Sequence, residues 1–118
     1  MSPTVLLVCR FAVARDQVPT FLTRARRALQ LLSDSGGLGG ELGRAVDDRD
    51  RWVLVVRFPS VVAYRRALSR YAVREHVVPL LSEALADEPS TYETLADVTG
   101  GKVGSHVSLL AAEEPTAR

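Results

Sequence analysis

The residues RWVLVVRF, at positions 51–58, set Trp52 and four valine or leucine residues between two arginines. Successive side chains of a β-strand point to opposite faces of its sheet, so this stretch has two faces. One face carries four large apolar side chains, namely Trp52, Leu54, Val56 and Phe58. The other carries Val53, Val55 and the charged Arg57. Because β-branched and aromatic residues favour strands, we expect a strand here whose two faces are both largely apolar.

The same double pattern occurs near the start of the chain, in residues 4–13, TVLLVCRFAV. Valine, leucine, cysteine and phenylalanine occupy the odd-numbered positions from 5 to 13, and the even-numbered positions are nearly as apolar. Arg10 is the only charged residue on that second face. Residues 4–13 therefore predict another strand that needs cover on both sides.

Two helical regions accompany these strands. Apolar residues recur at helical spacing from Val18 to Leu32, and Asp16 precedes them as the expected N-terminal cap. A second region follows the strand at 51–58, with Ser60 as its expected cap. It continues through residues 71–85, where Pro79 should kink or restart the helix.

Weaker patterns complete the series. The glycine-rich residues 36–46 contain a short strand, and the polar residues 47–50 form the turn of a hairpin with the strand that follows. Residues 90–96 alternate again and predict a fourth strand. Gly100 and Gly101 form a turn before a candidate fifth strand, Val103 to Leu110.

Strand, helix, hairpin, helix and strand, in this order, are typical of a ferredoxin-like β-α-β-β-α-β sandwich of the α+β class. We expect one such domain over residues 1–98 and a C-terminal tail over residues 99–118, disordered after its short strand. Two helices cover only one face of such a sheet. Because soluble monomers rarely expose a large apolar face, we expect a homodimer in which the two sheets pack together.

Composition narrows the function classes. The 118 residues carry a formal net charge of +1, and 47% of them are hydrophobic. This fits one ordinary globular domain and does not favour nucleic acid or an anionic membrane as a partner. Cys9 is the only cysteine, so no internal disulfide can form. No apolar run reaches the roughly 20 residues of a membrane span and no secretory leader is recognisable, so we expect a cytoplasmic protein.

The chain resembles the antibiotic biosynthesis monooxygenase superfamily of dimeric α+β barrels, in particular its small actinobacterial members. The resemblance covers roughly residues 5–95. It rests on the opening strand, on GGLGGELGRAVDD at 36–48, on RWVLVVRFPSVVAYRRALS at 51–69 and on YAVREHVVPLLSEALADEPSTYE at 71–93. It implies a dimeric barrel built from ferredoxin-like protomers. It also implies an oxygenase activity on an aromatic or quinol-type molecule, although the superfamily includes other activities.

Departures from the family pattern bear on the chemistry. Phe58 stands where the family commonly closes the third strand with tryptophan. In the haem-degrading branch, an asparagine, a tryptophan and the haem-ligating histidine correspond to Cys9, Ala67 and Val77 here. Only His76 lies close to that histidine position. These replacements argue against haem degradation.

Six residues are candidates for a functional site. The catalytic candidates are Arg57, Tyr71 and His76, and the substrate-binding candidates are Trp52, Phe58 and Tyr64. A histidine can act as a base near neutral pH or only hydrogen-bond within the fold. The aromatic residues can contact a flat ligand or fill the core, and Arg57 can stabilise an anion or form a salt bridge between protomers.

We therefore expect a cofactor-independent monooxygenase that acts on a small aromatic or quinol-type molecule. The alternatives are a non-catalytic dimeric ligand-binding or accessory protein and a polyketide-cyclase-like enzyme. We expect no flavin, haem or metal, because the chain has no phosphate-binding loop after a strand, no cysteine cluster and no paired histidines at ligand spacing.

Overall fold

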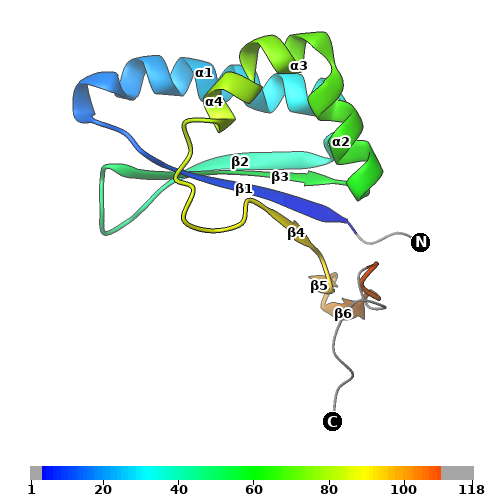
Figure 1. The fold of residues 1–118 in the computed structure, drawn as a ribbon. Helices are drawn as coiled ribbons and strands as arrows, with labels where there is room; N and C mark the ends of the chain where they lie inside the picture. The colour runs from blue at the N-terminus through cyan, green and yellow to red at the C-terminus, as the bar shows by residue number, and fades with distance from the viewer. Residues whose placement is uncertain (1–3, 110–118) are drawn as a thin grey trace.

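The computed structural model describes residues 4–109, whose main elements form two layers (Figure 1). Four antiparallel strands form a sheet in the order β2-β3-β1-β4, and the helices lie on one side of it. The strands are β1 (Val5–Ala12), β2 (Gly39–Arg44), β3 (Arg51–Phe58) and β4 (Thr91–Glu93). The helices are η1 (Arg15–Gln17), α1 (Val18–Asp34), α2 (Val61–Ser69), α3 (Tyr71–His76) and α4 (Val78–Leu81). This confirms the ferredoxin-like α+β fold that the sequence predicts.

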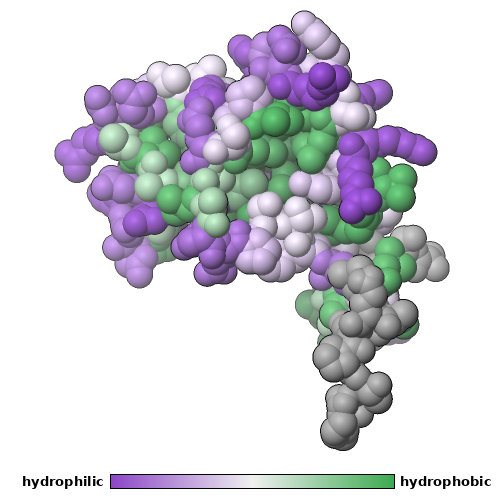
Figure 2. Space-filling model, in the orientation of Figure 1, coloured by the Kyte–Doolittle hydropathy of each residue, from purple (hydrophilic) through white to green (hydrophobic). Residues whose placement is uncertain are grey.

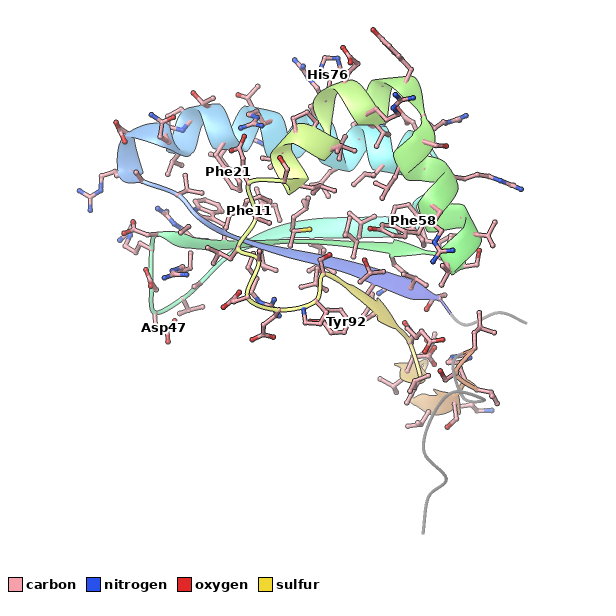
Figure 3. All side chains as sticks on the ribbon, in the orientation of Figure 1. Phe11, Phe21, Asp47, Phe58, His76 and Tyr92 are labelled. Atoms are coloured by element: carbon pink, nitrogen blue, oxygen red, sulfur yellow. The ribbon has the colours of Figure 1, made fainter. Side chains whose placement is uncertain are left out.

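The two double-faced strands are the central pair of the sheet. β1 and β3 pair along their whole length, and the side chains on their helix-facing side are buried. Leu54 and Phe58 are fully buried, and Phe11 and Phe21 meet in the space between sheet and helices, with ring centroids 5.1 Å apart (Figure 3). The core therefore lies between the two layers, on the face of β3 that carries its four largest side chains.

The helical layer follows the predicted caps and breaks, with one exception. The Ser60 side chain accepts a hydrogen bond of 3.0 Å from the N–H of Ala63 and caps α2 as predicted. Arg70 has extended backbone between α2 and α3, and Pro79 lies in the first turn of α4, where it restarts the helix. Asp16 does not cap α1, contrary to our expectation. It lies inside η1, so its backbone lacks the extended conformation of an N-cap residue.

The C-terminal strands differ from the expected arrangement. β4 spans three residues rather than 90–96, because Glu93 pairs with Val5, the first residue of β1, and the residues after Glu93 have no partner in that strand. The following residues form a separate hairpin of β5 (Ala96–Thr99) and β6 (Lys102–Ser105), which projects away from the two layers (Figure 1). Gly100 and Gly101 have positive φ, as a two-residue hairpin turn requires. Residues 110–118, where we expected disorder, lie outside the described residues.

The other face of the sheet, here called the open face, is not covered by any helix of residues 4–109 (Figure 1). Its centre consists of apolar side chains that are only half-buried in the protomer: Leu6, Val8, Val53 and Val55. Arg10 and Arg57 lie on the same face. A single protomer therefore has an open sheet and no closed barrel, and pairing of two copies stays a prediction.

Gly40 allows β2 to lie close to β3. A Cβ atom at this position would press against the carbonyl oxygen of Val55 and lie 2.9 Å from Cγ2 of Val56. We expect Gly40→Ala to lower the free energy of unfolding by about 1–3 kcal/mol, as overpacking commonly does. Gly39→Ala is the matched control, because its Cβ meets no atom within 4 Å. Urea unfolding measures both, and equal losses would contradict the steric explanation.

Candidate functional site

A cavity of about 520 Å³ lies between the helix-facing side of β1 and the helices α2 and α4. Leu7 and Cys9 line it from the sheet, and Leu68 and Leu81 line it from the helices. Residues 82–90, here called the connecting segment, supply most of its remaining wall. Figure 2 shows apolar residues gathered between the helical layer and the sheet, with hydrophilic residues around them. A mostly apolar hollow of this size can hold a small aromatic molecule.

Tyr64 is the sequence-predicted site residue that the structure places at this cavity. It projects from α2, and its ring meets that of Phe58 edge-on, with the centroids 5.5 Å apart. The Thr91 hydroxyl donates a hydrogen bond of 3.2 Å to the Tyr64 hydroxyl. Because the phenol accepts in this bond, its own proton remains for donation to a bound molecule.

Cys9 lies beneath the same cavity and is 3% exposed. Burial raises the pKa of its thiol from 9.0 to about 11, against a smaller lowering by the charge of Arg10. The thiol is therefore protonated at neutral pH and is a poor nucleophile. Because the folded state favours the protonated form, the stability that this thiol contributes is complete below pH 9.0 and is lost as the pH rises to about 11.

The raised pKa of the Cys9 thiol leads to a testable prediction. We expect native Cys9 to react with an aromatic disulfide reagent at pH 8 at least about tenfold more slowly than Cys9 in the chain unfolded in urea. The absorbance of the released thiolate measures both rates. Equal rates would contradict the burial and the raised pKa of the thiol.

The connecting segment leaves α4, passes the edge of β1 and reaches the open side of the sheet before it returns as β4 (Figure 1). Two main-chain hydrogen bonds of 2.7 Å fasten it to β1. The N–H of Leu85 donates to the carbonyl of Arg10, and the N–H of Val8 donates to the carbonyl of Ser90. This wall of the cavity is thus an irregular segment held at the sheet edge.

Arg57, Tyr71 and His76 do not line this cavity. His76 lies on the outer surface of the helical layer (Figure 3), with its Nδ1 atom 3.2 Å from Nη1 of Arg27. Tyr71 is 77% exposed, and Arg57 is exposed on the open face. Arg57 instead lines a separate hollow beside Gly39 and Gly40. Val73 is the buried residue of α3, and Tyr71 and His76 lie on its exposed side. Arg57 points away from the helices because successive side chains of β3 alternate between the two faces of the sheet.

The two other candidates belong to the core. Phe58 is fully buried behind Tyr64, and Trp52 lies beside Phe21 with ring centroids 5.5 Å apart. The guanidinium carbon of Arg44 lies 4.7 Å from the centroid of the Trp52 ring, within the range of a cation–π interaction. Neither residue lines the cavity, but Trp52 lines a second hollow, described next. The sequence-predicted residues are therefore not brought together in one site, and their roles in catalysis stay predictions.

A second hollow, of about 660 Å³, lies at the hairpin end of β1 and β3. Its lining includes Val8, Arg10 and Val53 of the open face, and Arg51 and Asp48 near the turn between β2 and β3. Leu85 of the connecting segment borders both this hollow and the cavity beneath the helices. β1 separates the two spaces, because Leu7 and Cys9 line the cavity and Val8 and Arg10 line the second hollow.

The sequence pattern assigns residues 82–85 to the second helical region and Ser90 to the fourth strand, but α4 ends at Leu81 and β4 begins at Thr91, so the connecting segment was not predicted. The sequence feature that could have indicated this segment is its acidic residues, including Glu83 and Glu88. Glu83 accepts two hydrogen bonds, of 3.0 and 2.9 Å, from Arg24 of α1, and this arginine lowers the pKa of the carboxyl group. Glu88 lines the cavity and lies 3.9 Å from Arg10.

Residues 4–109 contain no group of three or more His, Cys, Asp and Glu side chains suited to hold a metal ion. Within the same range, no helix is long and apolar enough to cross a membrane. The expected lack of a flavin, haem or metal stays a prediction.

Comparison with known proteins supplies the family. The sequence model of the family described as antibiotic biosynthesis monooxygenase matches residues 4–78, well over half of the chain. No curated protein matches the chain.

Solved structures share the fold at low sequence identity. The cofactor-independent oxygenase SnoaB from Streptomyces nogalater is 20% identical, with a TM-score of 0.61 over 86% of this chain and 100% of that chain. Rv0793 from Mycobacterium tuberculosis is 14% identical, with a TM-score of 0.63 over 82% of this chain and 98% of that chain. A conserved protein from Methanosarcina mazei is also 14% identical, with a TM-score of 0.63 over 78% of this chain and 91% of that chain.

Proposed function

Because this chain belongs to the antibiotic biosynthesis monooxygenase family, we propose that it oxygenates a flat aromatic or quinol-type molecule without a cofactor. The observation that carries this proposal is the apolar cavity of about 520 Å³ beneath α2 and α4, with the Tyr64 hydroxyl at its lining. The similarity to the oxygenase SnoaB supports the proposal at the level of the fold.

In this proposal the substrate supplies the electrons that reduce oxygen. The bound molecule, for example an anthrone, loses a proton from its activated methylene group to water at the cavity mouth. Glu88 marks this mouth, because its side chain is 59% exposed. Tyr64 donates its proton in a hydrogen bond to the substrate oxygen on which the negative charge collects.

The remaining steps take place on the substrate. Electrons pass from the carbanion to O₂, a carbon–oxygen bond forms, and the resulting hydroperoxide loses water to leave a carbonyl group. One methylene group and one O₂ therefore give one C=O group and one H₂O. The leucine side chains around the cavity keep water away from the reactive carbanion.

The proposed working form is a homodimer in the cytoplasm, in which a second copy covers the open face. The half-buried apolar centre of that face, together with the burial of the opposite face by helices, supports this assembly. The two sheets facing each other would then form the dimeric α+β barrel.

The test is oxygen uptake with 1,8-dihydroxyanthrone and with a naphthohydroquinone in air, after subtraction of autoxidation. Quinone absorbance follows the product, and equilibrium dialysis of the aromatic molecule measures binding. Turnover above the background supports the proposal. Binding of the aromatic molecule without turnover would support a ligand-binding or accessory protein instead, and neither binding nor turnover would contradict both.

The variants His76→Ala, Tyr71→Phe and Arg57→Ala test the site that the sequence predicts. Loss of a general base commonly costs roughly a hundredfold to ten-thousandfold in rate. If turnover falls in one of these variants and not in Tyr64→Phe, the reaction takes place outside the cavity described above. A cyclised product without oxygen uptake would favour the polyketide-cyclase-like alternative.

A further inference from the structure

Arg10 contacts the connecting segment from the open face of the sheet. It lies in β1 opposite Val53, so its side chain is on the face away from the helices. Its main-chain carbonyl accepts the hydrogen bond from Leu85, and its Nη2 atom lies 3.9 Å from Oε1 of Glu88. The same residue thus holds the segment through its backbone and through its side chain.

Tyr92 connects Arg10 with the cavity wall. The interaction of its side chain with the guanidinium is the largest cause of the raised pKa of Arg10. The Tyr92 hydroxyl in turn donates to the carbonyl of Pro89 at 2.7 Å. Figure 3 shows Tyr92 beneath the sheet, on the side away from the helices. Pro89 and Glu88 both line the cavity, so these contacts link the open face to the cavity.

We propose that Arg10 is a positioning residue for the cavity, because its guanidinium holds the connecting segment in the conformation that forms the cavity's outer wall. The proposal deepens the proposed function, since it assumes that the aromatic molecule binds in this cavity. Arg10 does not itself line the cavity. It acts through Tyr92, Pro89 and Glu88.

The size of the expected effect follows from the exposure of these groups. In the single protomer the side chains of Arg10 and Glu88 are 41% and 59% exposed, so water screens their ion pair there. The fold does not depend on this pair, because β1 keeps its full pairing with β3. The main-chain bonds of Leu85 and Ser90 to β1 do not involve the guanidinium, so we expect its loss to move residues 86–89, which lie between them.

Arg51 provides a matched control. It lies at the start of β3, with Nε 3.7 Å from Oδ2 of Asp48 and a side chain that is 54% exposed. Arg51→Ala therefore also removes an exposed guanidinium that pairs with a carboxylate. Its partner lies in the turn between β2 and β3, not in the connecting segment.

The experiment compares Arg10→Ala, Arg10→Lys, Tyr92→Phe and Arg51→Ala with the native protein. Titration with 1,8-dihydroxyanthraquinone, a stable analogue of the proposed product, measures the Kd. We expect Arg10→Ala to raise this Kd about five- to tenfold, because it removes the exposed ion pair with Glu88 and the interaction with Tyr92. Tyr92→Phe should raise it less, and Arg10→Lys should recover part of the loss through Glu88. Arg51→Ala should leave it unchanged.

Amide hydrogen exchange supplies a second measurement that needs no ligand. Exchange in residues 85–90 should be faster in Arg10→Ala than in Arg51→Ala, while exchange in β3 is the same in both. If the native protein binds no aromatic probe, the proposed function fails. The exchange comparison then still decides whether the Arg10 guanidinium holds the connecting segment. Equal exchange in the two variants overturns the inference. Faster exchange in Arg10→Ala with an unchanged Kd also overturns the inference, because Arg10 would then hold the segment without positioning the cavity wall.

Discussion

Tyr64→Phe is expected to lower kcat/KM for oxygenation of 1,8-dihydroxyanthrone by roughly a hundredfold to a thousandfold, the usual cost of one donor to a developing oxyanion. Phenylalanine keeps the ring that packs edge-on against Phe58, so the substitution removes only the hydroxyl. Oxygen uptake, corrected for autoxidation, measures the rate. Thermal unfolding of both proteins checks that the fold is unaffected.

Two further variants test whether the phenol acts as a donor. Thr91→Val removes the group that donates to the Tyr64 hydroxyl and leaves the phenol proton in place, so it should lower the rate less than Tyr64→Phe. Tyr71→Phe removes a hydroxyl from a tyrosine that is 77% exposed and lies outside the cavity. A larger loss in Tyr71→Phe than in Tyr64→Phe would contradict the assignment of Tyr64.

Val55→Asp is expected to convert the proposed dimer into a folded monomer. Val55 lies opposite Val8 at the centre of the open face, where a second copy would cover it. An aspartate there would be an unpaired charge buried in the interface, at a cost of about 3–5 kcal/mol for each copy. In the separate protomer the same side chain reaches water, so the fold should lose little stability. Light scattering across a dilution series measures the mass, and circular dichroism measures the fold.

Val46→Asp is the matched control for this substitution. Val46 is fully exposed in the turn between β2 and β3, away from the centre of the open face. It should leave the mass of the assembly unchanged. A native protein that is monomeric at micromolar concentration would contradict the proposed dimer, as would a Val55→Asp variant that remains dimeric.

The bounds of β1 and β3 could be predicted almost to the residue, because apolar side chains on both faces mark these strands over nearly their whole length. β3 has the predicted bounds, and β1 lacks only one residue at each end of the predicted range. The fourth strand could not be bounded in this way. Its alternation runs on from residue 90 to 96, but pairing ends where β1 begins, and that limit depends on a strand far away in the sequence.

The candidate site was less predictable, because helical breaks change which side chains face inward. Tyr64 lies early in α2, close to its Ser60 cap, and lines the cavity, while its role in substrate binding stays a prediction. Tyr71 and His76 lie beyond the extended Arg70, where a new helix begins with its own orientation. The orientation of these two side chains could not be predicted from a helix assumed to continue through Arg70. Contacts of the connecting segment also depend on tertiary structure alone, so Glu88 could not be singled out.

The position of β1 in the sheet also affects how this protein folds during synthesis. β1 is made first, yet it lies between β3 and β4, which follow it by tens of residues. Until those strands leave the ribosome, the most apolar stretch of the nascent chain has no partner, and such stretches are prone to aggregate. A chain that stops before Thr91 would leave Val5–Leu7 as an unpaired apolar edge, open to another nascent chain. Completion of the last strand therefore protects the first.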